Sequence, residues 1–85
     1  MYRVVYRKSA AKALTRMPKP LAIKFQMAFK KMATDPETEG LDIKPLSGRG
    51  GYRLRIGQYR AIYHIEGNGM VIDVLKIGPR GDIYK

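Results

Sequence analysis

Three arginines on two short alternating segments have residue types and spacing that suit phosphate chemistry. Arg53 and Arg55 are two residues apart, so their side chains would share one face of a β-strand. Arg60 follows the two-residue turn Gly57-Gln58, which makes it a cross-strand neighbour of that pair. A guanidinium keeps its charge and offers a planar fork of donors that fits a phosphate. Three such groups could bind one phosphate and stabilise the negative charge that develops on it.

The same arginines have a second interpretation. Charged residues that alternate with apolar ones are also typical of a sheet whose outer face is solvated. The spacing of the three arginines leaves phosphate binding and a plain solvated face both open.

Other kinds of chemistry have less support in the residue types. His64 and Glu66 would share a strand face with Arg60 and could form an acid–base pair, although a lone strand histidine is more often a packed or surface residue. With one histidine, no cysteine and no pair of carboxylates at ligand spacing, we expect no metal site. The chain has neither a P-loop nor a dinucleotide-binding fingerprint, so we expect no cofactor.

The charge of the chain is strongly one-sided. Seventeen basic residues against seven acidic ones give a net charge of +10. Residues 1–34 carry nine lysines and arginines and no acid, whereas residues 35–42 carry four acids and no base. Such a field attracts polyanions, with nucleic acid as the first candidate and an acidic protein as the second.

The first third of the chain predicts one strand and two helices. Residues 2–7 alternate as a β-strand does. Ser9 is expected to cap a helix whose apolar residues recur at positions i, i+3, i+4 and i+7. Pro18 and Pro20 separate it from a second helix that runs to about Thr34. Two helices joined by such a turn form an αα-hairpin.

The rest of the chain predicts two loops and three strands. Residues 35–42 are expected to form a linker or loop, and residues 47–51 a flexible loop. Beyond them the apolar period changes from 3.6 to 2, which predicts strands over residues 52–56, 59–65 and 70–77. The short turns between these strands make them an antiparallel meander.

These elements predict one small α+β domain. Eighty-five residues leave room for one core, so we expect a single domain over residues 1–85. The order β–α–α–β–β–β predicts an antiparallel sheet that the N-terminal strand joins non-locally, with the αα-hairpin on one face. No apolar run approaches the roughly 20 residues of a membrane span. The absence of cysteine suits a reducing compartment, so we expect a cytoplasmic protein without a membrane partner.

Three stretches of the chain resemble the RelE/ParE superfamily of toxins from type II toxin–antitoxin systems. They are residues 46–48, 52–63 and 74–80, and the twelve-residue central stretch is the most specific. The resemblance covers nearly the whole chain, including the helix pair that ends in Asp-Pro and the final Ile83-Tyr84. It implies a RelE-like fold and a cognate antitoxin as partner.

Within this superfamily the chain looks like the RelE branch, whose members cut mRNA in the ribosomal A site. The resemblance implies a catalytic set at Arg53, Arg55, Arg60, Arg80 and Tyr84. ParE-type gyrase inhibitors share the fold without this set, so the set favours a ribosome-dependent, metal-independent endoribonuclease. We expect Lys44, Arg49 and Lys76 to contact the RNA.

The resemblance also implies a mechanism with one role unfilled. The ribose 2′-hydroxyl would attack the adjacent phosphorus in line, while Arg60 holds the phosphate beside Arg53 and Arg55. Arg80 would protonate or stabilise the leaving 5′-oxygen, and Tyr84 would stack on a base or relay a proton. The best-known enzyme of this branch has lysines at the first pair, but an arginine is not deprotonated in proteins. The sequence therefore leaves the proton acceptor open.

Two other functions remain open at the level of sequence. The chain could inhibit gyrase by contact, as ParE-type toxins do, or it could be an inactive homologue that only binds an antitoxin. In each case we expect a monomeric toxin that joins its antitoxin in a hetero-oligomer, with the ribosome and mRNA as further partners of the RNA-cleaving form.

Overall fold

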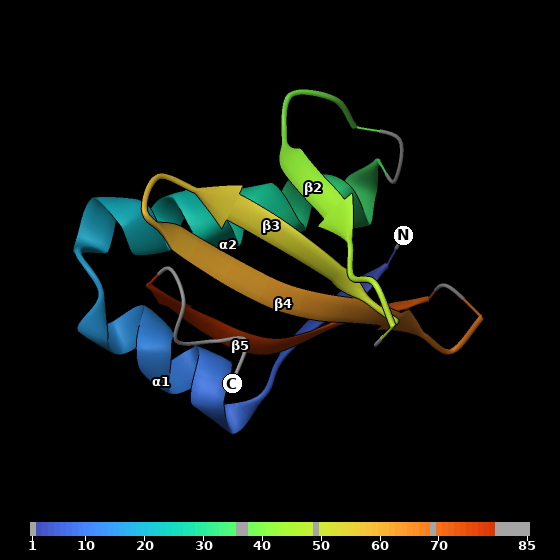
Figure 1. Ribbon diagram of the computed structural model, residues 1–85, viewed down its shortest axis with the longest axis horizontal. Helices are drawn as coiled ribbons and strands as arrows, with labels where there is room; N and C mark the ends of the chain where they lie inside the picture. Colours follow the sequence, from blue (N-terminus) through green and yellow to red (C-terminus); the bar gives the residue numbers. More distant parts are fainter. Residues whose placement is uncertain (1, 36–37, 49, 69, 80–85) are drawn as a thin grey trace.

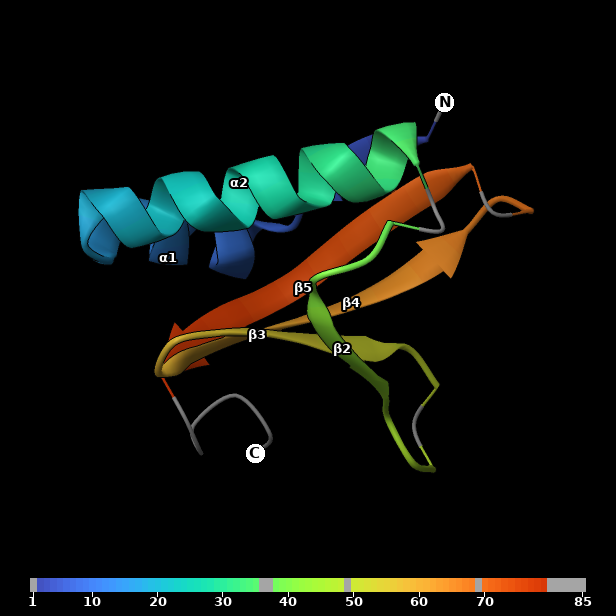
Figure 2. The same ribbon diagram turned by 90° about the horizontal axis from the view of Figure 1, so that it is seen from above.

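A computed structural model describes residues 2–35, 38–48, 50–68 and 70–79, in which two helices cover one face of a five-stranded sheet (Figures 1 and 2). The predicted α+β architecture is confirmed. The elements in chain order are β1 (Arg3–Tyr6), α1 (Lys8–Arg16), α2 (Lys19–Thr34), β2 (Asp42–Pro45), β3 (Tyr52–Ile56), β4 (Tyr59–Glu66) and β5 (Val71–Pro79).

Helix α1 begins two residues earlier than predicted and without the predicted cap. Ser9 lies inside the helix, and the residue at the N-cap position is Arg7, whose side chain makes no capping hydrogen bond. The Arg7 backbone N–H instead donates to the carbonyl oxygen of Val74 in β5, at 2.9 Å. A tertiary contact therefore fixes the start of this helix, and a local serine cap does not.

Helix α2 follows the prediction closely. Pro18 occupies its N-cap position and Pro20 its first turn, where a proline costs no backbone hydrogen bond. The helix buries Phe25 and Phe29 completely, and the Phe29 ring meets that of Tyr63 edge to face at 5.3 Å. Within the described residues, neither helix is long and apolar enough to cross a membrane.

The strand order of the sheet is β1-β5-β4-β3-β2. Strands β3, β4 and β5 form the predicted antiparallel meander, and β1 joins it non-locally as expected. However, β1 runs parallel to β5, so the sheet is mixed and not antiparallel throughout. A parallel pair needs a long connection, and the helices and other strands between β1 and β5 supply it.

Strand β2 corrects the predicted loop. Asp42 was expected to end an acidic linker, but it begins a four-residue edge strand that pairs antiparallel with β3. The pairing places Asp42 opposite Arg55 and Lys44 opposite Arg53. A stretch of four residues is too short for its alternation to predict a strand. The proline at its end is tolerated because β2 is an edge strand.

Candidate phosphate-binding site

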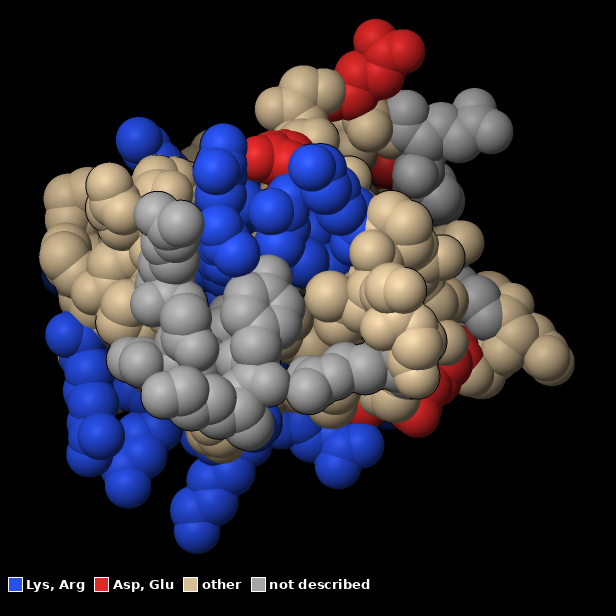
Figure 3. Space-filling model, in the orientation of Figure 1, with Lys and Arg blue, Asp and Glu red and all other residues tan. Residues whose placement is uncertain are grey.

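The three arginines of the predicted site lie on the sheet face that points away from the helices. Leu54 and Ala61, their neighbours in sequence, are fully buried in the core between sheet and helices, so the alternating residues point to the other side. Arg55 in β3 is the direct cross-strand partner of Arg60 in β4, which confirms the predicted proximity. Figure 3 shows basic side chains gathered over these central strands, with an acidic group beside them.

Arg53 is the most firmly held of the three. Its side chain is 10% exposed, and one terminal nitrogen lies 2.7 Å from Oδ1 of Asp42. Its Nε is buried and has no hydrogen-bond partner among the described residues. Arg53 therefore directs one terminal nitrogen at the partly exposed carboxylate of Asp42, and most of its own surface is closed to a ligand.

Arg55 and Arg60 border a polar hollow of about 390 Å³, which Gly57 and Gln58 complete. The side chain of Arg55 is half-exposed, and its Nε lies 3.0 Å from Oδ2 of Asp42. Because a guanidinium has five N–H donors, this contact leaves the terminal groups of Arg55 for a ligand. Gly57 has a φ of +61°, a left-handed conformation that suits the tight β3–β4 turn. The hollow can receive an anion such as a phosphate.

The remaining residues of the predicted site divide into two groups. Lys44 in β2 and Lys76 in β5 are exposed and belong to strands that flank the arginines. Arg49, Arg80 and Tyr84 lie outside the described residues. Beside the arginines, the sequence analysis missed Asp42, whose signal was an alternation of only three residues, Asp42, Ile43 and Lys44.

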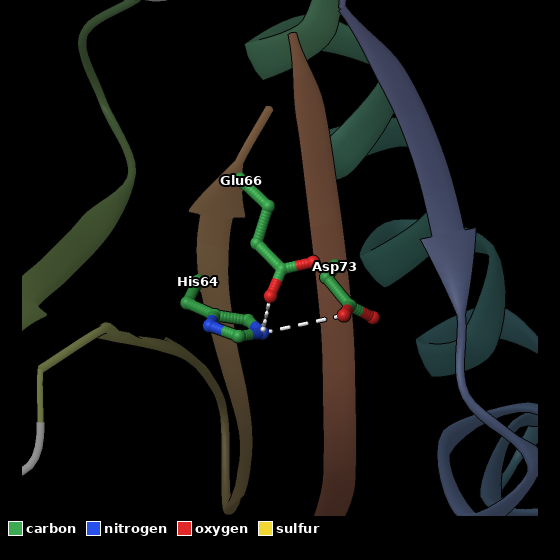
Figure 4. A group of neighbouring side chains, drawn as sticks. All are labelled: His64, Glu66 and Asp73. Carbon is green, nitrogen blue, oxygen red and sulfur yellow. Dashed lines mark hydrogen bonds and ion pairs between the residues drawn. The ribbon is translucent and has the colours of Figure 1, made fainter. Parts of the chain in front are cut away.

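A second polar cluster lies on the same sheet face, towards β5. His64 Nε2 is 3.4 Å from a carboxylate oxygen of Glu66 and 3.2 Å from Oδ2 of Asp73 (Figure 4). The predicted proximity of His64 and Glu66 is thus present. The sequence analysis missed Asp73, which the β4–β5 pairing places opposite His64.

Asp73 is the buried centre of this cluster, with only 3% of its surface exposed. The Arg7 guanidinium donates to both of its oxygens, with the shortest contact at 2.8 Å. The hydrogen bond from Arg7 lowers the pKa of Asp73 more than burial raises it, and the hydrogen bond from His64 lowers it further. One ligand atom from each of His64, Glu66 and Asp73 lies within 4.8 Å of the others, the spacing of a metal site. Because Arg7 already compensates the Asp73 charge, we interpret the cluster as a polar network around one buried carboxylate, which joins the start of α1 to β4 and β5.

An apolar groove lies between α2 and the edge of the sheet at β2 and β3. Met27, Leu41 and Ile56 line it, and Met27 is 65% exposed. Lys24, Lys30 and Lys31 of the same helix also border it. The groove therefore combines an apolar floor with a positive rim.

Comparison with known proteins places this chain among toxins. Residues 2–84 match the family described as the ParE toxin of the type II toxin–antitoxin system parDE. The protein named "Putative toxin RelE1" of Methanocaldococcus jannaschii is 33% identical over 86 residues, which cover 99% of this chain and 96% of that protein.

Solved structures share the fold. A chain of the archaeal RelE–RelB complex from Pyrococcus horikoshii OT3 is 35% identical, with a TM-score of 0.80 over 95% of this chain and 97% of that one. The isolated RelE toxin of E. coli is 18% identical, with a TM-score of 0.75 over 99% of this chain and 92% of that one, and shows a similarity of fold alone.

The mixed sheet with a helical hairpin on one face matches these solved structures, so the chain has the RelE-like α+β fold. The chain belongs to the ParE toxin family and is a toxin of a type II toxin–antitoxin system. The predicted membership of the RelE/ParE superfamily is thereby confirmed.

Proposed function

We propose that this toxin is a ribosome-dependent endoribonuclease that cleaves mRNA in the A site. The observation that supports this most is the direct pairing of Arg55 with Arg60 beside an open polar hollow. Two guanidiniums from paired residues that line one hollow can bind the oxygens of one phosphate and oppose the charge that builds up during cleavage. The surrounding lysines would hold the RNA backbone without reading its sequence.

In the proposed reaction, the ribose 2′-hydroxyl releases its proton to solvent and its oxygen attacks the adjacent phosphorus in line with the 5′-oxygen. The bond from phosphorus to the 5′-oxygen breaks, and that oxygen takes up a proton, so no net proton is consumed. The products are a 2′,3′-cyclic phosphate and a 5′-hydroxyl end. Arg55 and Arg60 stabilise the negative charge of the phosphorane, and Arg53 adds positive charge beside Arg55. The family resemblance implies two more roles: Arg80 protonates or stabilises the leaving oxygen, and Tyr84 stacks on a base or relays a proton. The arginines supply the positive charge, so the chemistry needs no metal ion or cofactor.

We also propose that this toxin is cytoplasmic and binds an acidic antitoxin. The free toxin would be a monomer, and the complex with the antitoxin a hetero-oligomer. The solved relative from P. horikoshii is a complex of RelE with RelB. The groove on α2 fits a partner segment whose apolar residues are flanked by acids, because its floor is apolar and lysines border it.

Primer extension on a translated mRNA, with and without ribosomes, tests the proposed activity. The wild-type toxin should produce cleavage in the A site only when ribosomes are present. Arg60→Ala should abolish the cleavage, whereas Arg3→Ala, an exposed arginine on the far edge strand β1, should preserve it. Circular dichroism would verify that both variants are folded.

The same proteins distinguish the second candidate function. The matching family is named after ParE, so inhibition of gyrase by contact is the alternative. A wild-type toxin that blocks gyrase supercoiling and leaves ribosome-bound mRNA intact would refute the nuclease proposal. An Arg60→Ala variant that is folded and still cleaves at the full rate would refute the assigned site.

A further inference from the structure

One carboxylate holds both arginines of β3. Asp42 accepts a hydrogen bond from a terminal nitrogen of Arg53 with Oδ1, at 2.7 Å, and forms an ion pair with Arg55, whose Nε lies 3.0 Å from Oδ2. The β2–β3 register places Asp42 directly opposite Arg55. The side chain of Asp42 is 39% exposed, so the carboxylate lies at the boundary between the packed sheet and the solvent.

The two contacts have different consequences. Arg53 is buried, and its contact with Asp42 fixes the carboxylate from the interior side. Arg55 is half-exposed, and its contact uses Nε, the donor nearest the aliphatic stem. A guanidinium held at Nε loses much of its freedom to rotate, while its terminal groups stay available at the hollow shared with Arg60.

Charge supports the same assignment. Arg53, Arg55 and Arg60 are neighbours on one sheet face, and like charges that face one another across strands repel. An anion among them offsets this repulsion before any ligand arrives. A flexible arginine would have to be ordered on binding, at a cost in side-chain entropy that preorganisation avoids.

We propose that Asp42 is a positioning residue, which with Arg53 behind it aligns Arg55 for a phosphate at the hollow beside Arg60. Its catalytic consequence rests on the proposed nuclease function, but the alignment itself does not. The alternative role for Asp42 is competition. A carboxylate that merely occupied the donors of Arg55 would compete with phosphate, and its removal would improve phosphate binding.

Side-chain NMR tests the alignment without any activity. In ¹⁵N-labelled wild-type protein, the Nε–Hε signal of Arg55 should be resolved and shifted from that of a free arginine, because Nε lies 3.0 Å from the charged Oδ2 of Asp42. Asp42→Asn should shift and broaden that signal. Glu39→Gln removes the same charge from an exposed residue three positions earlier and should leave the signal unchanged. An Arg55 signal that is indifferent to Asp42→Asn would overturn the proposal.

Single-turnover cleavage of ribosome-bound mRNA tests the consequence. Asp42→Asn should lower the maximal rate by about ten- to a hundredfold, because misalignment of a catalytic group has effects of this order. The toxin concentration at half-maximal rate should change little, since the exposed lysines that bind RNA are intact. Asp42→Glu keeps the charge and should recover part of the rate. A rate that is unchanged or raised in Asp42→Asn would identify a competitor in place of a positioning residue.

Two further measurements keep the test decisive. If Asp42→Asn does not fold, Arg53→Lys replaces it, because lysine keeps the charge but loses the planar fork that fixes Asp42. The Arg55 signal should then broaden and the maximal rate should fall, and no change in either would overturn the proposal.

If the wild-type toxin does not cleave mRNA, the nuclease function fails and titration with inorganic phosphate decides the role of Asp42 alone. Phosphate should perturb the signals of Arg55 and Arg60 in wild-type protein, and about tenfold more weakly in Asp42→Asn. Equal or tighter binding by the variant would count against positioning.

Discussion

Gly51 lies at the entrance to β3, and its replacement by alanine should destabilise the protein by an amount that can be worked out from the structure. Its φ is +85°, and a Cβ there would lie 2.9 Å from the backbone oxygen of Tyr63 and 3.4 Å from Cβ of His64. The left-handed backbone costs a non-glycine residue about 1–2 kcal/mol. The contact with Tyr63 adds a further penalty of about 1–3 kcal/mol, because the central strand β4 cannot move aside freely.

Gly48 provides the matched control for this prediction. Its φ is +77°, but a Cβ there would have no described atom within 4 Å. Gly48→Ala should therefore cost only the backbone penalty, while both substitutions change the unfolded chain alike. Urea unfolding should give a midpoint for Gly51→Ala that is lower than that of Gly48→Ala by about 0.3–3 M, for slopes of about 1–3 kcal/mol/M. Equal midpoints would show that β4 yields to the extra methyl group and that the close approach is not a constraint.

Three other predictions concern titration and binding. Because Arg7 lowers the pKa of Asp73 in the folded state, the folded protein binds fewer protons below about pH 4 than the unfolded chain does, so its stability should fall as the pH falls there. Urea unfolding at pH 7 and pH 3 measures this loss of stability, and the loss should be smaller in Asp73→Asn. Burial, with a smaller effect of Tyr52, raises the pKa of Tyr63 to about 12. The stability that the neutral Tyr63 hydroxyl contributes should therefore decline as the pH rises from 10 to 12, and Tyr63→Phe should remove one late step from the absorbance titration at 295 nm. Met27→Asp should weaken antitoxin binding at least tenfold and leave ribosome-dependent cleavage intact, and calorimetry that finds unchanged affinity would remove the groove from the interface.

The sequence by itself determined the elements whose period is local. The proline pair separated two amphipathic helices, and the change to alternation located β3, β4 and β5. The alternation also placed Arg53 and Arg55 on one face and brought Arg60 next to them, because a two-residue turn leaves little choice of register. Each of these features depends on residues that are close in the chain.

Only the tertiary structure decided the features that depend on distant partners. The parallel pairing of β1 with β5 joins residues almost seventy positions apart, and the start of α1 follows from it. Strand β2 forms because it can pair with the free edge of β3, and its four residues are too few for their alternation to predict a strand. The same pairing brings Asp42 to the arginines, as the β4–β5 register brings Asp73 to His64. A carboxylate in a sequence does not indicate which cation it will meet, since that contact is set by strand register, and strand register is set by the packing of the whole sheet.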